Sequence, residues 1–169
     1  MIRKDQQEDK EVKKKKEESQ NYIIGLMALL YSDTIKHLSA KFGQEVIDEA
    51  RKAFIDSMVN DARKAFQNKK DKSLKSFLDW LLSGLTEGHE YEVVESKEDS
   101  VKFRFTKCPW AEYFIKIGNP EIGKFFCLAD EPLAKAFNEK INFKRTMTIM
   151  DGDKYCNHHY FIDSEEKTY

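Results

Sequence analysis

The hydrophobic pattern of the chain changes its period near residue 90, from a helical spacing to a strand spacing. Before that point, apolar residues recur every three or four positions. This pattern predicts one helix from Tyr22 to a stop at Gly43 and a second over residues 46–65. A third helix is expected to begin at the capping residue Ser73 and to continue to Leu85.

After residue 90, apolar and polar residues alternate. Tyr91 and Val93 begin one predicted strand, and the alternation over residues 101–106 predicts the next. Residues 96–100 are polar and are expected to form the loop between them. This segment therefore predicts a β-hairpin.

Helical spacing returns in the following segment. Residues 110–117 predict a short helix, and Asn119 with Pro120 predicts the cap and first position of another. Because proline lacks a backbone N–H, Pro132 is expected to bend or restart that helix near Asp130.

Two further strands are predicted at the end of the chain, over residues 141–150 and 154–162. They are joined by the short glycine-containing loop 151–153. The sum is an α+β fold in the order ααα-ββ-αα-ββ. It has an antiparallel sheet of about four strands, in two hairpins, packed against a helical layer. Residues 20–169 are expected to form this single domain.

Residues 1–19 are almost entirely charged or amide and are expected to form a flexible or frayed helical extension. The net charge of −1 argues against a nucleic-acid surface. The apolar run 23–31 is too short to cross a membrane, and the start lacks the pattern of a signal peptide. The three cysteines are an odd number, which favours free thiols or a metal over disulfides and indicates a cytoplasmic protein.

Candidate chemistry lies in the last third of the chain. Cys127 and Asp130 are three positions apart on a predicted helix and share nearly one face. The carboxylate would suit an amidine, a base or a metal. Alternatively, Cys127 is a small buried hydrophobe and Asp130 caps a restarted turn.

Cys156, His158 and Tyr160 alternate on a predicted strand and therefore share one face. A thiol, an imidazole and a phenol in one row are chemically competent, although they would also fit a half-buried strand. By the same parity His159 lies on the other face, so the two histidines cannot serve one site.

Arg145 falls on the expected apolar face of its strand. A buried guanidinium needs an anionic partner because an unpaired buried charge is costly. That partner is either Asp130, in a structural ion pair, or the carboxylate of a small ligand held through two hydrogen bonds.

Cys108 is grouped by strand parity with the outward side chains, so a twist before Pro109 would have to bring it inward. Three thiols and His158 could form a long-range zinc site, but the spacings match no compact zinc module. No glycine-rich phosphate loop, Gly-x-Ser-x-Gly elbow or His-Glu-x-x-His is present.

Several of these motifs, in this order, resemble the L-2-amino-thiazoline-4-carboxylic acid hydrolase family. The resemblance spans about residues 20–163 and is specific from about residue 105 onward. The matching pieces are Cys108-Pro109, Cys127-Leu-Ala-Asp130, Phe143-Lys-Arg145-Thr146-Met-Thr148-Ile149, Gly152-Asp153-Lys-Tyr-Cys156 and Tyr160.

The resemblance implies a hydrolase that opens a small cyclic amidine carboxylate, converting 2-amino-thiazoline-4-carboxylate to N-carbamoyl-cysteine in the namesake reaction. It suggests Arg145 for the substrate carboxylate and Asp130 or Asp153 for the amidine. Cys127 and Cys156 would be nucleophile or metal ligand, and His158 the acid or base.

The family often has Cys-Asp-Phe-Arg-Tyr where this chain has Cys156-Asn157-His158-His159-Tyr160, which would affect substrate choice or activity. The layout also resembles the 4-vinyl-reductase type of α+β fold. The alternative function is therefore a non-catalytic small-ligand-binding or sensor domain.

Overall fold

The computed structural model describes residues 2–163, for residues 2–10 and 13 through the backbone alone. The elements are α1 (Ile2–Phe42), α2 (Glu45–Phe66), α3 (Leu74–Ser83), β1 (Glu90–Lys97), β2 (Ser100–Lys107), α4 (Pro109–Lys116), α5 (Pro120–Leu128), α6 (Asp130–Phe137), β3 (Ile141–Lys144), the 3₁₀ turn η1 (Ile149–Asp151) and β4 (Cys156–Ile162). The predicted α+β class is confirmed, with the last predicted helix divided into α5 and α6.

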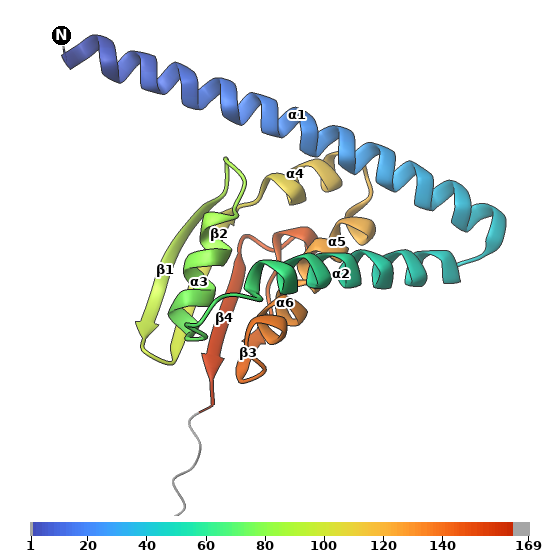
Figure 1. Ribbon diagram of the computed structural model, residues 1–169. Coiled ribbons are helices and arrows are strands. Elements are labelled where there is room, and N and C mark those ends of the chain that lie inside the picture. The colour runs from blue at the N-terminus through green and yellow to red at the C-terminus, as the bar shows by residue number, and fades with distance from the viewer. Residues whose placement is uncertain (1, 164–169) are drawn as a thin grey trace, which may run out of the picture.

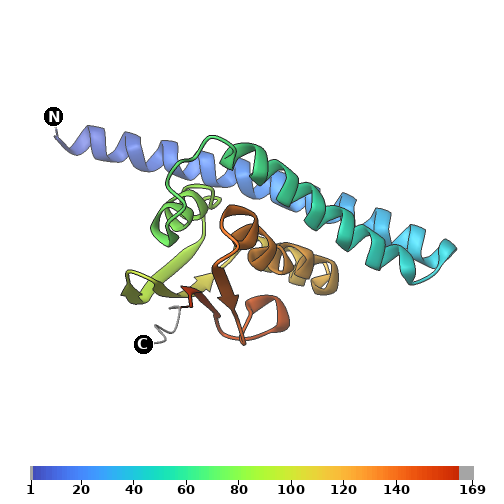
Figure 2. The same ribbon diagram turned by 60° about the horizontal axis from the view of Figure 1, so that its bottom comes forward.

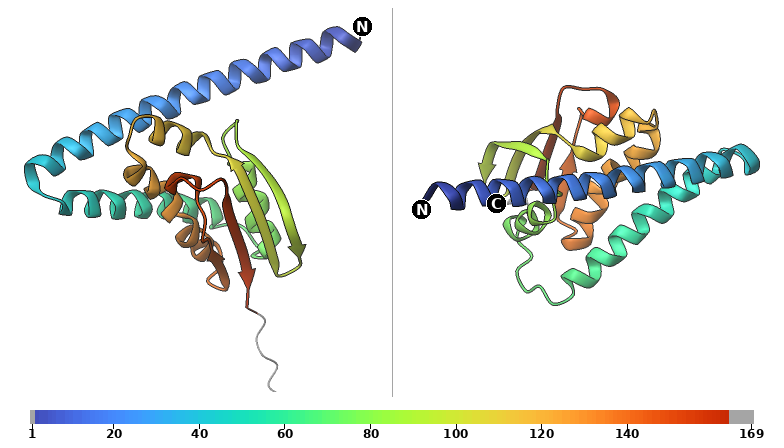
Figure 3. Two further views of the ribbon diagram at one scale, coloured as in Figure 1. Left: turned by 180° about the vertical axis from the view of Figure 1, so that it is seen from behind. Right: turned by 90° about the horizontal axis from the view of Figure 1, so that it is seen from above.

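The four strands form one antiparallel sheet in the order β1-β2-β4-β3. Helices lie on one side of it, and Figure 2 shows α1 and α2 next to each other with the strands on the opposite side. The other face of the sheet is seen from behind in the left view of Figure 3. The two hairpins therefore join through β2 and β4 into a single layer under the helices.

The alternation of β2 determines which of its side chains enter the core. Val101, Phe103 and Phe105 are buried, whereas Lys102 and Arg104 lie on the open face and pair with glutamates of β1. Ser73 caps α3 as expected, because its hydroxyl accepts a hydrogen bond from the backbone N–H of Ser76.

Helix α1 begins well before the predicted start at Tyr22 and is continuous from Ile2. It runs across the top of the molecule in Figure 1, and α2 returns beneath it. Exposed i,i+4 ion pairs such as Glu11–Lys15 lie along its charged half. Farther along, Lys16 contacts Glu87 at 3.0 Å and thereby joins α1 to the loop between α3 and β1.

The prediction of a strand over residues 141–150 is wrong beyond Lys144. The backbone N–H groups of Thr146 and Met147 both donate to the side-chain oxygen of Asn157, at 2.9 and 2.7 Å. These side-chain bonds replace the ladder of a strand, so Arg145 stands on a loop rather than on a strand face. The loop then closes through η1, where Gly152 has a φ of 92° that favours glycine.

Two hydrophobic clusters make up the core. One packs the sheet against α2, α3 and α6 around Phe77, Phe137 and Tyr160. The other packs α1, α4 and α5 together around Phe114 and Phe125. The candidate functional residues lie where these two clusters meet.

Candidate functional site

A break between two helices positions Cys127 and Asp130. Helix α5 ends at Leu128 and α6 begins at Asp130, with Ala129 fully buried between them. Pro132 accounts for the break, because its ring would clash with the carbonyl of Leu128 in a continuous helix. The predicted restart near Asp130 is therefore confirmed.

Arg145 and Asp130 form a buried ion pair. A guanidinium N–H of Arg145 donates to Oδ2 of Asp130 at 2.5 Å, and another donates to the backbone carbonyl of Cys127 at 2.9 Å. The two charged side chains are only 12% and 18% exposed. Of the two partners considered for Arg145, this structure contains Asp130.

Burial and the charge of the partner act in opposite directions on each member of the pair. Burial raises the pKa of Asp130 to about 6, although the guanidinium of Arg145 acts in the opposite direction. For Arg145, burial acts to lower the pKa, but the nearby Asp130 carboxylate and Cys127 outweigh it and the pKa is raised. Arg145 therefore remains a cation, while Asp130 titrates close to neutral pH.

Thr148 connects two of the three cysteines. Its hydroxyl oxygen lies 3.9 Å from Sγ of Cys127 and accepts from Sγ of Cys156 at 3.6 Å. The backbone N–H of Ile149 also donates to Sγ of Cys156, at 3.3 Å. Sequence reasoning quoted Thr148 as part of a motif and missed its role, because the loop that carries it was predicted to be a strand.

Asp153 has a place in the same loop but does not line the cavity that holds the cysteines. Its Oδ2 accepts a hydrogen bond from the backbone N–H of Thr148 at 2.8 Å. Asp153 therefore holds the backbone of Thr148 in position, and the Thr148 hydroxyl in turn contacts the thiols of Cys127 and Cys156.

Cys108 turns inward at the junction between β2 and α4. Strand β2 ends at Lys107, and Cys108 is the N-cap of α4 with Pro109 at the first helical position. Because the chain changes direction here, the strand parity that pointed Cys108 outward no longer applies. Burial raises the pKa of Cys108 to about 12 and that of Cys127 to about 11, so both thiols stay protonated at neutral pH.

His158 and Tyr160 extend from β4 toward the helices, as the parity of the strand predicted. The ring of His158 lies 4.8 Å from that of Phe105 and is edge-on to that of Phe143 at 5.3 Å. Nδ1 of His158 and the hydroxyl of Tyr160 are both buried and have no hydrogen-bond partner among the described residues. Two such atoms on one cavity wall indicate a place for a polar ligand.

Burial lowers the pKa of His158 to about 3, and the positive charge of Arg145 contributes to the shift. Burial also raises the pKa of Tyr160 well above its ordinary value. At neutral pH the cavity therefore presents a neutral imidazole and a neutral phenol.

These side chains surround one cavity of about 310 Å³ at the seam between the two hydrophobic clusters. The expected residues that line it are Cys108, Cys127, Asp130, Arg145, Cys156, His158 and Tyr160. A volume of this size lies at the lower end of the range for small-molecule sites. The fold thus brings together seven of the eight residues expected from the sequence.

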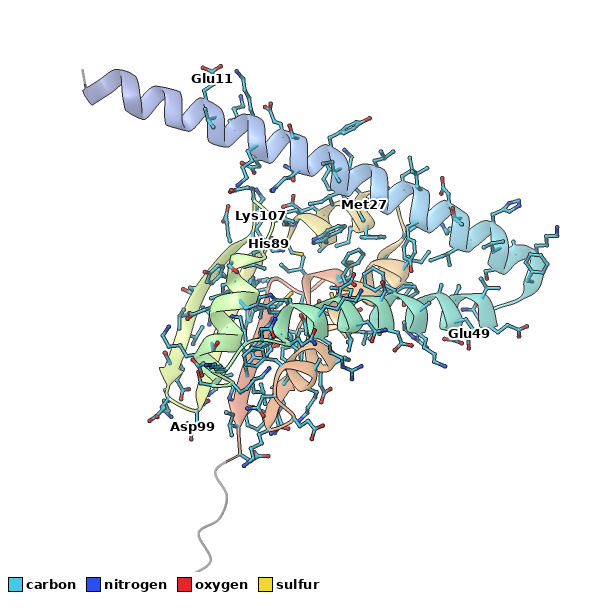
Figure 4. The ribbon with its side chains drawn as sticks, viewed as in Figure 1. Glu11, Met27, Glu49, His89, Asp99 and Lys107 are labelled. Carbon is cyan, nitrogen blue, oxygen red and sulfur yellow. The ribbon has the colours of Figure 1, made fainter. Side chains whose placement is uncertain are left out.

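His89 also lines the cavity and was not expected from the sequence. In Figure 4 it lies beneath α1, close to Lys107. Its Nδ1 is 2.9 Å from the backbone carbonyl of Thr86 and 3.1 Å from the hydroxyl of the same residue. A carbonyl only accepts, so Nδ1 carries the proton in the neutral ring and Nε2 has a free lone pair. Burial lowers the pKa of His89.

No sequence signal distinguishes His89 from His37, which is exposed on α1. The nearest sequence feature is Thr86, three positions earlier in a glycine-containing turn. Only the fold shows that this turn borders the cysteines.

Arg145 also borders two hollows outside the cavity. One is lined by Lys102, Arg104 and His159 on the open face of the sheet, and the other by Leu128 and Glu131. Arg145 therefore forms part of the wall between the cavity and the surface.

Among the side chains that the structure describes, no group of three or more His, Cys, Asp and Glu is arranged to hold a metal ion. Within residues 2–163, no helix combines the length and the apolar character needed to cross a membrane.

Comparison with known proteins gives one family match. A family model described as L-2-amino-thiazoline-4-carboxylic acid hydrolase matches residues 19–160. Among solved structures, the chain is similar to the Fe(II) unliganded H-NOX protein from K. algicida, with 10% identity and a TM-score of 0.42 over 80% of this chain and 72% of that chain. A search of curated proteins found no match.

Proposed function

Because the chain belongs to the L-2-amino-thiazoline-4-carboxylic acid hydrolase family, we propose that it opens a small cyclic amidine carboxylate by hydrolysis in the cysteine-lined cavity. The observation that carries the proposal is the convergence of thiols, an ion pair and two imidazoles on one cavity of about 310 Å³. Such a group of titratable side chains with shifted pKa values is typical of a reactive site.

The namesake reaction sets the tasks of the site. A water oxygen bonds to the ring carbon between sulfur and nitrogen, the carbon–sulfur bond breaks, and the sulfur leaves with a proton. The products contain a carbamoyl group and a free thiol. The site must therefore remove a proton from water, return one to sulfur, and hold the amidine and the carboxylate.

His89 is suited to the role of base. Its Nδ1–H is directed to the carbonyl of Thr86, which fixes the ring and leaves Nε2 unprotonated. An imidazole whose tautomer is fixed in this way has an unprotonated nitrogen that can act as a general base. His89 would take the proton of the attacking water and pass it to the leaving sulfur.

His158 and Tyr160 are suited to binding. The buried Nδ1 of His158 and the Tyr160 hydroxyl lack partners within the described chain, so a ligand that bonds both removes an existing desolvation cost. A pKa of about 3 makes His158 a weak base, and we therefore assign it to hydrogen bonding with the amidine rather than to proton transfer.

The charged pair would hold the two ends of the substrate. Arg145 uses one N–H for Asp130 and one for Cys127, and a guanidinium has five. The remaining donors suit a carboxylate. Asp130, ionised above a pKa of about 6, suits the positively charged amidine.

The thiol of Cys127 favours a water route over a covalent one. Cys127 has a pKa of about 11 and is protonated at neutral pH, whereas the nucleophilic form of cysteine is the thiolate. Cys127→Ser is therefore expected to retain turnover within about tenfold of the wild type. Loss of turnover in a folded Cys127→Ser protein, together with a covalent adduct on Cys127 in the wild type, would establish the cysteine route instead.

The proposal is tested by incubating the protein with a panel of cyclic amidine carboxylates and titrating released thiol. We expect about one thiol per substrate consumed and a carbamoyl product in the mass spectrum. A folded protein that opens no member of the panel contradicts hydrolysis.

A second function, a non-catalytic ligand-binding domain, is favoured by one observation. The thiols of Cys108 and Cys127 are protonated and His158 is neutral, so these three groups provide no ready nucleophile. This function predicts a ligand that remains bound through purification and no thiol release from the panel.

A further inference from the structure

Most of the apolar lining of the cavity, its apolar wall, is supplied by helices. Five successive helices contribute to it, from α2 to α6, together with the loop after α3. The side chains are Met58, Leu81, Trp110, Phe126 and Leu133 from the helices and Leu85 from the loop. Trp110 and Phe126 are stacked with ring centroids 4.2 Å apart, which makes a flat and rigid surface.

Of the polar groups, Cys127 and Asp130 lie at the break between α5 and α6, and the others that would bind the ring and its carboxylate come from outside the helices. His158 and Tyr160 belong to β4, and Arg145 belongs to the loop after β3. The cavity therefore has a polar wall, formed by β4, the loop after β3 and the break between α5 and α6, and an apolar wall that comes mainly from the helices.

The cavity is larger than the namesake substrate requires. Cavities of about 300–1,000 Å³ bury drug-sized ligands, whereas the namesake substrate has only about nine non-hydrogen atoms. The cavity measures about 310 Å³. Once the ring occupies the polar wall, the apolar wall would still face empty space.

Resting on the proposed function, we propose that the substrate of this chain is a cyclic amidine carboxylate with an apolar substituent seated against Trp110, Phe126 and Leu81. The ring and its carboxylate bond the polar wall, and the substituent removes the helical wall from water. An apolar wall of this kind binds alkyl or aryl groups and gives no hydrogen bond to a polar one.

The size of the effect follows from the burial of methylene groups. Each buried CH₂ is expected to improve binding about fourfold. A three-carbon substituent should therefore bind about 60-fold more tightly than the unsubstituted ring.

The test is a series of 2-amino-thiazoline-4-carboxylates that carry hydrogen, methyl, ethyl or propyl. The substituent is on the ring carbon between the sulfur and the carbon that bears the carboxylate. We expect kcat/KM to rise about fourfold for each carbon until the wall is covered. A flat or falling series, with the unsubstituted ring as the best substrate, overturns the proposal.

A variant in α3 tests whether the substituent binds at the apolar wall. Leu81→Phe fills part of the space beside the wall and should lower the ratio of kcat/KM for the propyl compound to kcat/KM for the unsubstituted ring. Leu82→Phe is the matched control, because Leu82 is the next residue of α3 and does not line the cavity. Equal series in both variants would overturn the assignment of the substituent to this wall.

Calorimetry on the same series separates this proposal from the proposed function. Affinity that rises with chain length but without turnover would remove hydrolysis and retain the apolar subsite. Turnover of the whole series with equal affinities would retain hydrolysis and remove the subsite.

Discussion

At the scale of single residues, the strongest inference from the sequence concerned Arg145. A guanidinium among apolar neighbours implies an anion, and the structure places it on the carboxylate of Asp130. The strand on which that inference depended does not extend to Arg145. Asp130 was nevertheless one of the two partners expected, because the cost of an unpaired buried charge does not depend on the local backbone.

The base assignment predicts a large effect from a small change at His89. His89→Gln should lower kcat by about 10²- to 10⁴-fold, because it removes the proton acceptor from the cavity. His89→Ala should regain part of the lost rate when imidazole is added. The control is His159→Gln, a residue outside the cavity whose Nε2 lies 2.9 Å from the Ser100 hydroxyl. Wild-type kcat in a folded His89→Gln protein would remove His89 from the mechanism.

His158 predicts a specific dependence of stability on pH. Its pKa is about 3 in the folded protein and about 6.5 in the unfolded chain, so the unfolded chain binds more protons between these values. The free energy of unfolding therefore rises with pH in that range, and His158 costs about 2 to 3 kcal/mol at pH 4.5 relative to pH 7.

Urea unfolding at pH 4.5 and pH 7 measures this difference. His158→Gln should lose less stability on acidification than the wild type does, by about the same amount. The control is His37→Gln on the exposed face of α1, which should behave as the wild type. Equal acid sensitivity in His158→Gln and the wild type would show that His158 does not remain neutral in the fold.

At the scale of elements, local sequence patterns predicted the features that nearby residues determine. They missed the loop that a side chain from another element holds. The restart at Pro132 and the cap at Ser73 follow from local rules and were predicted. The loop of residues 145–155 was predicted as strand because Phe143, Met147 and Ile149 alternate with polar residues. The side chain that holds this loop belongs to Asn157 of β4, which lies outside the loop. The sequence pattern within the loop therefore does not reveal the interaction.

Asn157 therefore carries a testable structural role. Asn157→Ala frees two backbone N–H groups and should lower the free energy of unfolding by about 1–2 kcal/mol. Asn157→Asp keeps an oxygen acceptor for both N–H groups and should remain close to the wild type. Chemical denaturation of both variants measures the difference, and equal stabilities would exclude the role.

At the scale of the whole molecule, the cavity exists because two hydrophobic clusters meet without merging. The sequence predicted the helices and strands that form these clusters, and it grouped the cysteines into one candidate site. It did not predict His89 or the apolar wall, because both depend on how helices distant in the chain pack around the seam. Composition alone does not show where a core leaves space.

The central claim is that a small cyclic amidine carboxylate binds in this cavity at its unpartnered polar atoms. The direct measurement is a crystal structure with a non-hydrolysable cyclic amidine carboxylate. We predict the ligand within hydrogen-bond distance of His158 Nδ1 and the Tyr160 hydroxyl, with its carboxylate beside Arg145. A ligand bound elsewhere, with the cavity filled only by water, would contradict the account.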